Sequence, residues 1–282
     1  MTHSTADPLH ALAHEHLPDG IAARWLGLLR PSLRLERATD ADTPVGRLGG
    51  LPELPEGVEW PVWEGHGPLS LVASVDCAAL PAAGLDIPLP TDGTLAFFHF
   101  DGRLDDGAAV VASDDPDSWS GARVVYVPAG TPVTRAAAPE GLPPYPEVPL
   151  AARLETTAPY PWHPVVYREF APMPDDHPVW GEEFREAVDE LTAGTEHRLG
   201  GHATPVQDEV EAAVARHALG CPPWNDPRIG QEALRWVLLA QFDSDDDAGM
   251  MWGDAGALYW LMRPEDLALR RFDRARFTWQ CG

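Results

Sequence analysis

The sequence RLGG at 47–50 occurs again at 198–201, and two further blocks follow each copy in the same order. The first copy is followed by LVASVD (71–76) and GTLAFFHF (93–100), and the second by LLAQFD (238–243) and GALYWLM (256–262). Corresponding blocks lie 151, 167 and 163 positions apart. An unchanged order with unequal spacing is typical of an old duplication whose loops have gained insertions. We therefore predict two related halves that meet at a seam, and such boundaries commonly hold pockets.

The repeated blocks have the apolar patterns of β-strands. In 69–75 an apolar residue stands at every second position, which predicts a half-buried strand, whereas the almost unbroken apolar run at 94–100 predicts a strand buried on both faces. The same reasoning, with turn-forming residues between the segments, predicts further strands at 108–112, 123–127, 237–242, 257–262 and 271–281.

Helical patterns lie mostly outside these blocks, at 7–17, 19–29, 181–193 and 207–219. Because helices and strands are segregated, the pattern favours an α+β fold over a doubly wound α/β sheet. We divide the chain into an N-terminal helical extension (1–40) and one domain (41–282). That domain consists of a first β repeat (about 46–135), a proline-rich connection (about 136–180) and a second repeat (about 181–282).

The charge balance narrows the range of partners. The chain has 44 acidic and 20 basic residues, a formal net charge of −24. Such a surface repels the phosphates of nucleic acids and anionic membranes, so we predict neither as a partner. A small ligand, a basic protein or a metal ion remains compatible. The three cysteines lack metal-type spacing and the N-terminus lacks a signal-peptide pattern, so we expect a cytoplasmic protein.

The stretch QFDSDDDAGMMWGDAG (241–256) is dense in polar and aromatic side chains that could form a site. Asp243, Asp245 and Asp247 alternate, and Asp254 is twelfth counting from Asp243. This spacing partly resembles a calcium loop with oxygen ligands at positions 1, 3, 5 and 12. Ala248 stands where that loop has its turn glycine, and strands flank the segment, so an EF-hand is excluded. A generic divalent site, for instance for Ca²⁺, stays open beside the simpler interpretation of a solvated acidic hairpin.

A second candidate is HRLGGHATPVQ at 197–207. Gly200 and Gly201 allow positive φ or close backbone approach, and a duplicated structural turn explains them without function. His197 and His202 are absent from the first copy, GRLGGLPELP, which favours a role specific to the second half. A single histidine is nevertheless more often a core or surface residue than a ligand.

The known motifs of several enzyme classes are absent. The chain has no GxGxxG after a strand, no GxxxxGK[ST] and no GxSxG, which argues against Rossmann, P-loop and α/β-hydrolase chemistry. A pair of carboxylates acting as acid and base stays open among so many acidic residues. Whether the protein is an enzyme is therefore left open.

At these motifs the chain resembles the YwqG-like family of bacterial proteins, a domain of unknown function. The resemblance covers roughly residues 40–282 and is carried by GGLPELPEGVEWPVWEG (49–65), HRLGGHATPVQ (197–207), LLAQFDSDDDAGMMWGDAGALYWLM (238–262) and RPEDLALRRFD (263–273). It implies a single β-rich, roll-like fold of two related halves with a few peripheral helices, and it brings no established reaction.

Our leading hypothesis is a non-catalytic binding protein with its site at the seam between the repeats. We select as ligand-binding residues those that the second repeat adds, together with its glycine turn and acidic loop: His197, Gly200, Gly201, His202, Gln207, Gln241, Asp243, Trp252, Gly253 and Asp254. The candidate metal ligands are Asp243, Asp245, Asp247 and Asp254. The alternatives are a metal-assisted enzyme that uses these carboxylates with a histidine base, and an immunity or scaffold protein with an acidic partner-binding face.

Overall fold

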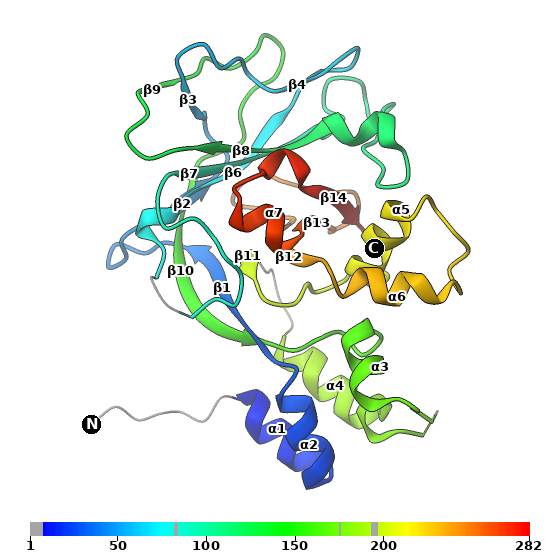
Figure 1. Ribbon diagram of the computed structural model, residues 1–282. Helices are drawn as coiled ribbons and strands as arrows, with labels where there is room; N and C mark the ends of the chain where they lie inside the picture. Colours follow the sequence, from blue (N-terminus) through cyan, green and yellow to red (C-terminus); the bar gives the residue numbers. More distant parts are fainter. Residues whose placement is uncertain (1–7, 82–83, 175, 193–196) are drawn as a thin grey trace.

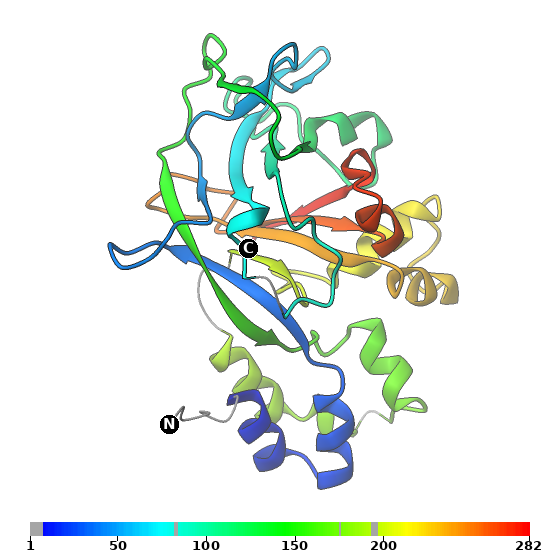
Figure 2. The same ribbon diagram turned by 60° about the vertical axis from the view of Figure 1, so that its left-hand side comes forward.

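A computed structural model describes residues 8–81, 84–174, 176–192 and 197–282. Their largest element is a ten-stranded antiparallel sheet that curves until it is nearly closed (Figures 1 and 2). From one edge to the other its strands are β14 (Arg276–Gln280), β13 (Ala257–Met262), β12 (Val237–Asp243), β11 (His197–Gly200), β1 (Arg30–Arg37), β10 (Val148–Thr157), β2 (Gly46–Leu48), β6 (Ser70–Asp76), β7 (Thr94–His99) and β8 (Ala122–Val127).

Smaller elements surround this sheet. The two-stranded ladders are β3 (Glu53–Pro55) with β9 (Val133–Arg135), and β4 (Val62–Trp63) with β5 (Gly67–Pro68). The helices are α1 (Pro8–His16), α2 (Asp19–Leu26), α3 (Pro164–Phe170), α4 (Glu182–Leu191), α5 (Val210–Ala218), α6 (Pro227–Ala233) and α7 (Pro264–Ala268), and the 3₁₀ turns are η1 (Cys77–Ala79), η2 (Pro116–Gly121), η3 (Pro178–Trp180) and η4 (Phe272–Arg274). Helices α1 to α4 gather at one end of the sheet, and α5 and α6 cover part of it (Figure 1).

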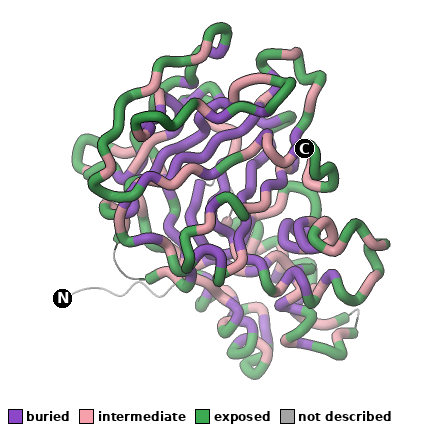
Figure 3. The backbone as a smooth tube through the Cα atoms, turned by 45° about the horizontal axis from the view of Figure 1, so that its top comes forward, coloured by how far each residue is buried: buried purple, intermediate pink, exposed green. Residues whose placement is uncertain are grey.

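The main core lies where the curved sheet faces itself. The ring of Phe97 on β7 packs 5.1 Å from that of Phe242 on β12 and 5.3 Å from that of Trp260 on β13, centroid to centroid. All three side chains are buried, as are long runs of the strands around them (Figure 3). A separate cluster holds the N-terminal helices, where Trp25 of α2 meets Phe184 of α4 edge to face at 5.1 Å. Burial of such aromatic side chains is the main stabilising contribution.

The strands of the repeated blocks pair in corresponding registers in the two halves. Leu48 lies opposite Ala73 between β2 and β6, and Leu199 lies opposite Ala240 between β11 and β12. The next ladder in each half then slips in register, just before Ala73 in one half and just before Ala240 in the other. The repeated blocks therefore occupy equivalent places in one sheet, while their descent from a duplicated unit stays a prediction.

The structure differs from the sequence-based expectations at three segments. Within the predicted helical extension, α1 and α2 are present, but β1 follows them in the middle of the sheet. The proline-rich connection contains β10, the ten-residue partner of β1. The predicted strand at 108–112 is wrong, because this segment forms no ladder; it is instead fixed by the indole of Trp279, which donates to the carbonyl of Val111 at 3.0 Å.

Among the described residues, no helix is long and apolar enough to cross a membrane.

Candidate functional site

The acidic loop between β12 and β13 is fixed by contacts within the chain. Asp245 Oδ2 lies 3.2 Å from Nε2 of His197, and its Oδ1 accepts a hydrogen bond from the amide of Ala248 at 2.7 Å. The contact with His197 is the main cause that lowers the pKa of Asp245. Asp247 pairs with Arg37 of β1 at 2.6 Å. These contacts within the chain account for the positions of the loop aspartates.

The predicted metal ligands of this loop do not converge. Asp243 Oδ1 accepts a hydrogen bond from the amide group of Gln241 at 2.9 Å. Asp254 is exposed, and its backbone carbonyl accepts from Gly282 at 2.8 Å. In the part of the chain that the structure describes, no three of the loop carboxylates come close enough together to share an ion. The structure thus brings Asp243 and Asp245 to His197 but leaves Asp254 outside this group.

His197 connects the loop to the sheet. Its side chain is buried, and its Nδ1 accepts a hydrogen bond of 3.2 Å from the backbone amide of Asp243. An imidazole whose Nδ1 accepts carries its proton on Nε2 when neutral, so Nε2 donates to Asp245. Both ring nitrogens are therefore engaged by the loop. His197 has a structural role here, which the sequence could not distinguish from a ligand role.

The glycine pair after His197 forms a tight turn that admits no side chain. Gly200 has φ +69° and Gly201 φ +74°. A Cβ on Gly201 would lie 2.6 Å from Oγ1 of Thr157 and 2.7 Å from Cβ of Ser32. The first copy of the turn has the same left-handed backbone at Gly49 and Gly50. These glycines are required by backbone conformation and close packing.

Two predicted glutamines also have structural partners. The amide of Gln207 donates to Oε1 of Gln280 at 3.0 Å, and Oε1 of Gln241 accepts from the amide of Thr204 at 2.9 Å. Both contacts hold the loop that follows β11 against the sheet. The structure therefore places Gln207 and Gln241 at separate points of this loop and does not assemble them into one cavity.

Trp252 and Gly253 line a pocket of about 160 Å³ between the two halves. On its other side lies His99 at the end of β7, whose ring stands edge to face with that of Trp252 at 5.9 Å. His99 is buried, and burial lowers its pKa to about 4 despite the nearby Asp101. The indole nitrogen of Trp252 donates to the carbonyl of Asp243 at 3.1 Å. Two of the predicted ligand-binding residues thus lie at a small seam pocket with a neutral imidazole.

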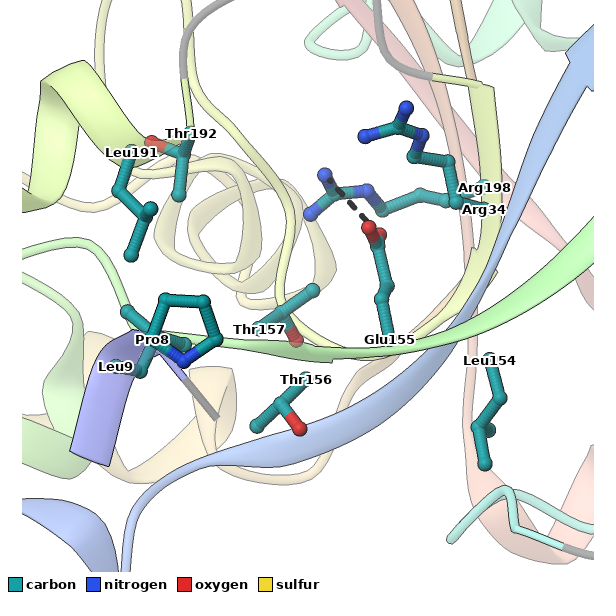
Figure 4. A pocket seen from close by; sticks show the side chains of 10 residues that line it. All are labelled: Pro8, Leu9, Arg34, Leu154, Glu155, Thr156, Thr157, Leu191, Thr192 and Arg198. Atoms are coloured by element: carbon teal, nitrogen blue, oxygen red, sulfur yellow. Dashed lines mark ion pairs between the residues drawn. The ribbon is translucent and has the colours of Figure 1, made fainter. Parts of the chain in front are cut away.

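A wider hollow of about 410 Å³ lies beside the central strands (Figure 4). Arg34 and Arg198 stand opposite each other there on β1 and β11. Oε1 of Glu155 lies 3.6 Å from Nη2 of Arg198, and Glu36 lies 3.5 Å from Arg34. Each arginine has a carboxylate close by: the Glu155–Arg198 pair links β10 to β11, whereas Arg34 and Glu36 pair within β1, so we interpret this row as structural ion pairing.

The most unusual chemistry lies elsewhere, in a buried group formed by His163, Glu209 and Glu211. One potential ligand atom from each lies within 4.8 Å of the others. Their side chains are 6%, 9% and 2% exposed, so water contributes little to their solvation. Two carboxyl groups buried together repel each other when both are ionised. Such an arrangement requires a proton or a cation to compensate its charge.

Local capping geometry positions His163. Residue 164 is proline, which lacks an N–H, and the next amide, that of Val165, donates to Nδ1 of His163 at 3.0 Å. The imidazole therefore caps α3 and turns Nε2 toward α5. Nε2 lies 3.6 Å from Oε1 of Glu209 and 3.8 Å from Oε1 of Glu211, distances that are too long for hydrogen bonds.

The two glutamates occupy the first turn of α5. Glu209 is its N-cap, with Oε2 accepting from the amide of Ala212 at 2.9 Å. Glu211 lies two residues further on, where the helix dipole also favours negative charge. Oε1 of Glu209 and Oε2 of Glu211 are buried without a hydrogen-bond partner among the described residues. The cap thus fixes the carboxylates but leaves one oxygen of each unsatisfied.

The two carboxyl groups differ in protonation. Burial and the neighbouring Glu211 raise the pKa of Glu209 well above its usual value. Burial also tends to raise the pKa of Glu211, but the Nε2–H of His163, which faces its carboxylate, and the neighbouring Glu209 outweigh it and lower the pKa to about 2. These opposite shifts favour a proton on Glu209 over one on Glu211. Groups whose surroundings separate their pKa values in this way often belong to functional sites.

His202 stands beside this group, with its ring edge to face with that of His163 at 5.3 Å. Nε2 of His202 lies 2.8 Å from the carbonyl of Leu28, which can only accept, so this nitrogen carries the proton. Nδ1 is buried without a hydrogen-bond partner in the described part of the chain. Burial, together with His163 and Arg30, lowers the pKa of His202 to about 3, so the ring is neutral. Of the predicted site residues, His202 is the one that lies at this centre.

The sequence analysis did not find His163, Glu209 or Glu211. His163 lies in the proline-rich connection. The glutamates lie in a segment whose apolar pattern predicts an ordinary amphipathic helix. The available signals were a histidine before proline at the start of α3 and an E-x-E pattern at the start of α5. Neither signal is specific without knowing that α3 and α5 meet.

A family model with the description "Domain of unknown function (DUF1963)" matches residues 46–281. The chain belongs to this family. The match includes the repeated blocks, the acidic loop and the buried group, and it begins after α1, α2 and β1. No curated protein matches the chain. Membership in DUF1963 assigns no reaction, so the function has to be inferred from the site itself.

Proposed function

We propose that the protein binds a divalent transition-metal ion, zinc being the best fit, through His163, Glu209 and Glu211. The observation that carries this proposal is the convergence of three potential ligand atoms within 4.8 Å in a buried place. Imidazole nitrogen and carboxylate oxygen are zinc ligands, and three protein ligands leave a fourth position open. A dication would also compensate the charge of two carboxylates.

The spacing of the ligand atoms supports a shared ion over direct hydrogen bonds. Zinc–ligand bonds of about 2.0–2.2 Å in a tetrahedral site separate the ligand atoms by roughly 3.4 Å. Nε2 of His163 lies 3.6 Å from Glu209 and 3.8 Å from Glu211. These two distances exceed the ligand spacing of a tetrahedral zinc site by only a few tenths of an ångström, and the two carboxylate oxygens lie within 4.8 Å of each other.

One feature of the site opposes metal binding. Because Nδ1 of His163 accepts from Val165, the imidazole proton lies on Nε2, the nitrogen that would have to bind the ion. Metal binding requires this proton to move to Nδ1 and the capping bond to break. A capping bond contributes about 1 kcal/mol, whereas zinc binding at pH 7 contributes roughly 10 kcal/mol or more at structural sites. The metal therefore outweighs the cap.

His202 has the proton arrangement that a metal ligand needs. A metal-binding histidine usually donates its other N–H to a carbonyl or carboxylate. His202 makes this contact with Leu28 and keeps Nδ1 unprotonated. We therefore propose His202 as the fourth ligand or, if it stays outside, as the neighbour that orients His163.

Calorimetric titration of the EDTA-treated full chain with zinc chloride tests the proposal. We expect about one ion per chain, a higher melting temperature, and an affinity lowered at least about tenfold by Glu211→Gln. Asp254→Asn is the matched control, since it removes a carboxylate of the acidic loop and should leave zinc binding unchanged. Unaltered binding by Glu211→Gln, or loss of binding in Asp254→Asn, would place the metal elsewhere and refute the assignment.

The wider predictions made from the sequence stay proposals. A cytoplasmic, non-catalytic binding protein is compatible with a buried metal centre, but the centre lies beside α3 and α5 and not at the seam. The corresponding registers of the two halves support descent from a duplicated unit, and the quoted motifs support kinship with YwqG-like proteins. Calcium binding by the acidic loop and an immunity role have no comparable structural support, and the zinc titration with Asp254→Asn tests the former in part.

A further inference from the structure

Helices α5 and α6 pack against each other, and α3 contacts α6 (Figure 1). The side chains of this region form a surface groove. It has two lobes, of about 570 Å³ and 630 Å³, which share Trp162, Ala212 and Trp224 and are therefore continuous. Both volumes lie in the range of ligand sites.

The exposed aromatic side chains of the protein gather in this groove. Among the described residues, the three aromatic side chains that are more than a third exposed are Trp162 at 41%, Tyr167 at 39% and Trp224 at 57%, and all three line it. Aromatic rings are costly to leave in water, so their grouping on one surface indicates a binding site.

These rings also present unused hydrogen-bond donors. The indole N–H groups of Trp162 and Trp224 make no hydrogen bond to any residue that the structure describes, and unlike the buried, unpaired indoles of Trp236 and Trp260 they belong to exposed side chains. An apolar ring with a free polar tip is suited to a partner that offers both apolar surface and carbonyl acceptors.

The two lobes differ in chemistry. The smaller lobe adds the carboxylate of Asp208 to its aromatic wall and no basic side chain; Glu209 also borders it, but its burial and raised pKa disfavour a charge, so Asp208 is the acidic group offered to a ligand. The larger lobe is walled mainly by aromatic, proline and aliphatic side chains, with Arg168 and Asp226 as its charged residues. The first lobe therefore suits a cationic side chain, and the second an apolar one.

The chain already shows that these rings accept guanidinium groups. Arg185 lies over the ring of Trp162 at 5.2 Å, and Arg216 over that of Trp224 at 4.9 Å. Each arginine covers one part of its ring, and both rings remain substantially exposed. Cation–π attraction of this kind, together with the net charge of −24, favours a basic partner.

We propose that the groove binds a basic, proline-rich segment of another protein, with prolines on Trp162, Trp224 and Tyr167 and an arginine or lysine beside Asp208. Polyproline II segments have no internal hydrogen bonds, so their carbonyls are free to accept from indole N–H groups. They are also ordered before binding and dock into aromatic-lined grooves. This inference does not depend on the metal centre, because it uses the exposed wall of the groove.

Titration of the full chain with a synthetic twelve-residue peptide, rich in proline and with one terminal arginine, tests this inference through tryptophan fluorescence and calorimetry. We expect saturable binding that Trp224→Ala weakens at least about tenfold and that Asp208→Asn weakens about threefold. Replacing the peptide arginine by glutamine should weaken binding to the native chain but have little further effect on Asp208→Asn. Leu269→Ala, which removes a 62% exposed side chain outside the groove, is the control and should bind as the native chain does.

Three outcomes would overturn the proposal. The first is that the peptide does not bind. The second is that the native chain and Trp224→Ala bind it equally. The third is that a peptide whose prolines are replaced by alanine binds equally well. A fluorescence response to a neutral oligosaccharide with none to the peptide would also overturn it and indicate a carbohydrate site. Titration in EDTA separates this proposal from the metal proposal, because peptide binding should persist within about threefold when zinc is removed.

Discussion

Nε2 of His163 lies 3.8 Å from Oε1 of Glu211, and both side chains are more than nine-tenths buried. His163 faces Glu211 and contributes to its lowered pKa, whereas burial and the neighbouring Glu211 raise the pKa of Glu209. The two glutamates of this helix start therefore have pKa values shifted in opposite directions, and their variants should behave differently.

We predict that Glu211→Gln lowers the free energy of unfolding at pH 7 in EDTA by about 1–3 kcal/mol, because it removes a buried ionised acceptor. Glu209→Gln should leave it unchanged or raise it, because glutamine replaces a carboxyl group whose charged form is disfavoured by burial and by Glu211. Urea denaturation of both variants measures the difference. Equal destabilisation by the two substitutions would contradict the opposite pKa shifts of the two glutamates.

Zinc affinity should rise with pH. The raised pKa of Glu209 favours a bound proton in the folded apoprotein, and an incoming ion competes with that proton. We expect zinc binding to release protons, so that its apparent enthalpy differs between buffers of different ionisation enthalpy, and Glu209→Gln to reduce this buffer dependence. A proton release that is the same in the variant would exclude Glu209 as the source.

The stability of the protein should fall as the pH is lowered through the range of histidine titration. Burial lowers the folded-state pKa of His99 to about 4 and that of His202 to about 3, against 6.5 for an ordinary histidine. Below pH 6.5 these two histidines bind protons in the unfolded chain but stay neutral in the folded chain. The free energy of unfolding therefore decreases as the pH falls from 6.5 toward 4. Each group adds at most about 1.4 kcal/mol per pH unit.

Urea denaturation at pH 7, 6 and 5 measures this slope. His99→Gln removes one of the two titrating groups and should make the slope shallower, even if the variant is less stable at pH 7. His10→Gln, on an exposed position of α1, is the matched control. An unchanged slope in His99→Gln would show that His99 is not the source.

Gly201→Ala should destabilise the protein by more than about 3 kcal/mol. The substitution combines a left-handed backbone with a Cβ at 2.6 Å from Oγ1 of Thr157, so both strain and overpacking contribute. Gly57→Ala is the matched control, since it has φ +80° but no atom within 4 Å of the added Cβ. It should cost only about 1–2 kcal/mol. Similar costs at both positions, measured by urea denaturation, would contradict a packing role for Gly201.

Phe97→Ala should cost about 3–5 kcal/mol, because it leaves a cavity between β7 and the opposing strands, where Phe97 meets Phe242 and Trp260. Trp224→Ala should change the free energy of unfolding by less than about 1 kcal/mol, because this side chain is 57% exposed. Thermal and urea denaturation compare the two. A large loss from Trp224→Ala would indicate that the groove is a structural feature.

Much of the sheet could be predicted from the sequence. The apolar periodicities located β6, β7, β8, β12 and β13, and the RLGG blocks located the two glycine turns. β1 and β10 could not be located in this way. Charged residues alternate with Leu33 and Leu35 in β1, and β10 continues out of a proline-rich stretch, so their local patterns are weak. Their pairing with each other and with both halves stabilises them as strands.

The candidate site also combines features that the sequence predicts with features that depend on the tertiary structure. The sequence by itself determined that the acidic loop joins two strands and that the glycine pairs are turns. Only the tertiary structure decided which carboxylates matter: those of the loop are tied to His197, Arg37 and backbone amides, while Glu209 and Glu211 meet His163 from a distant segment. Local patterns fix backbone conformation over a few residues, but burial and convergence of charged groups depend on how the helices pack on the sheet.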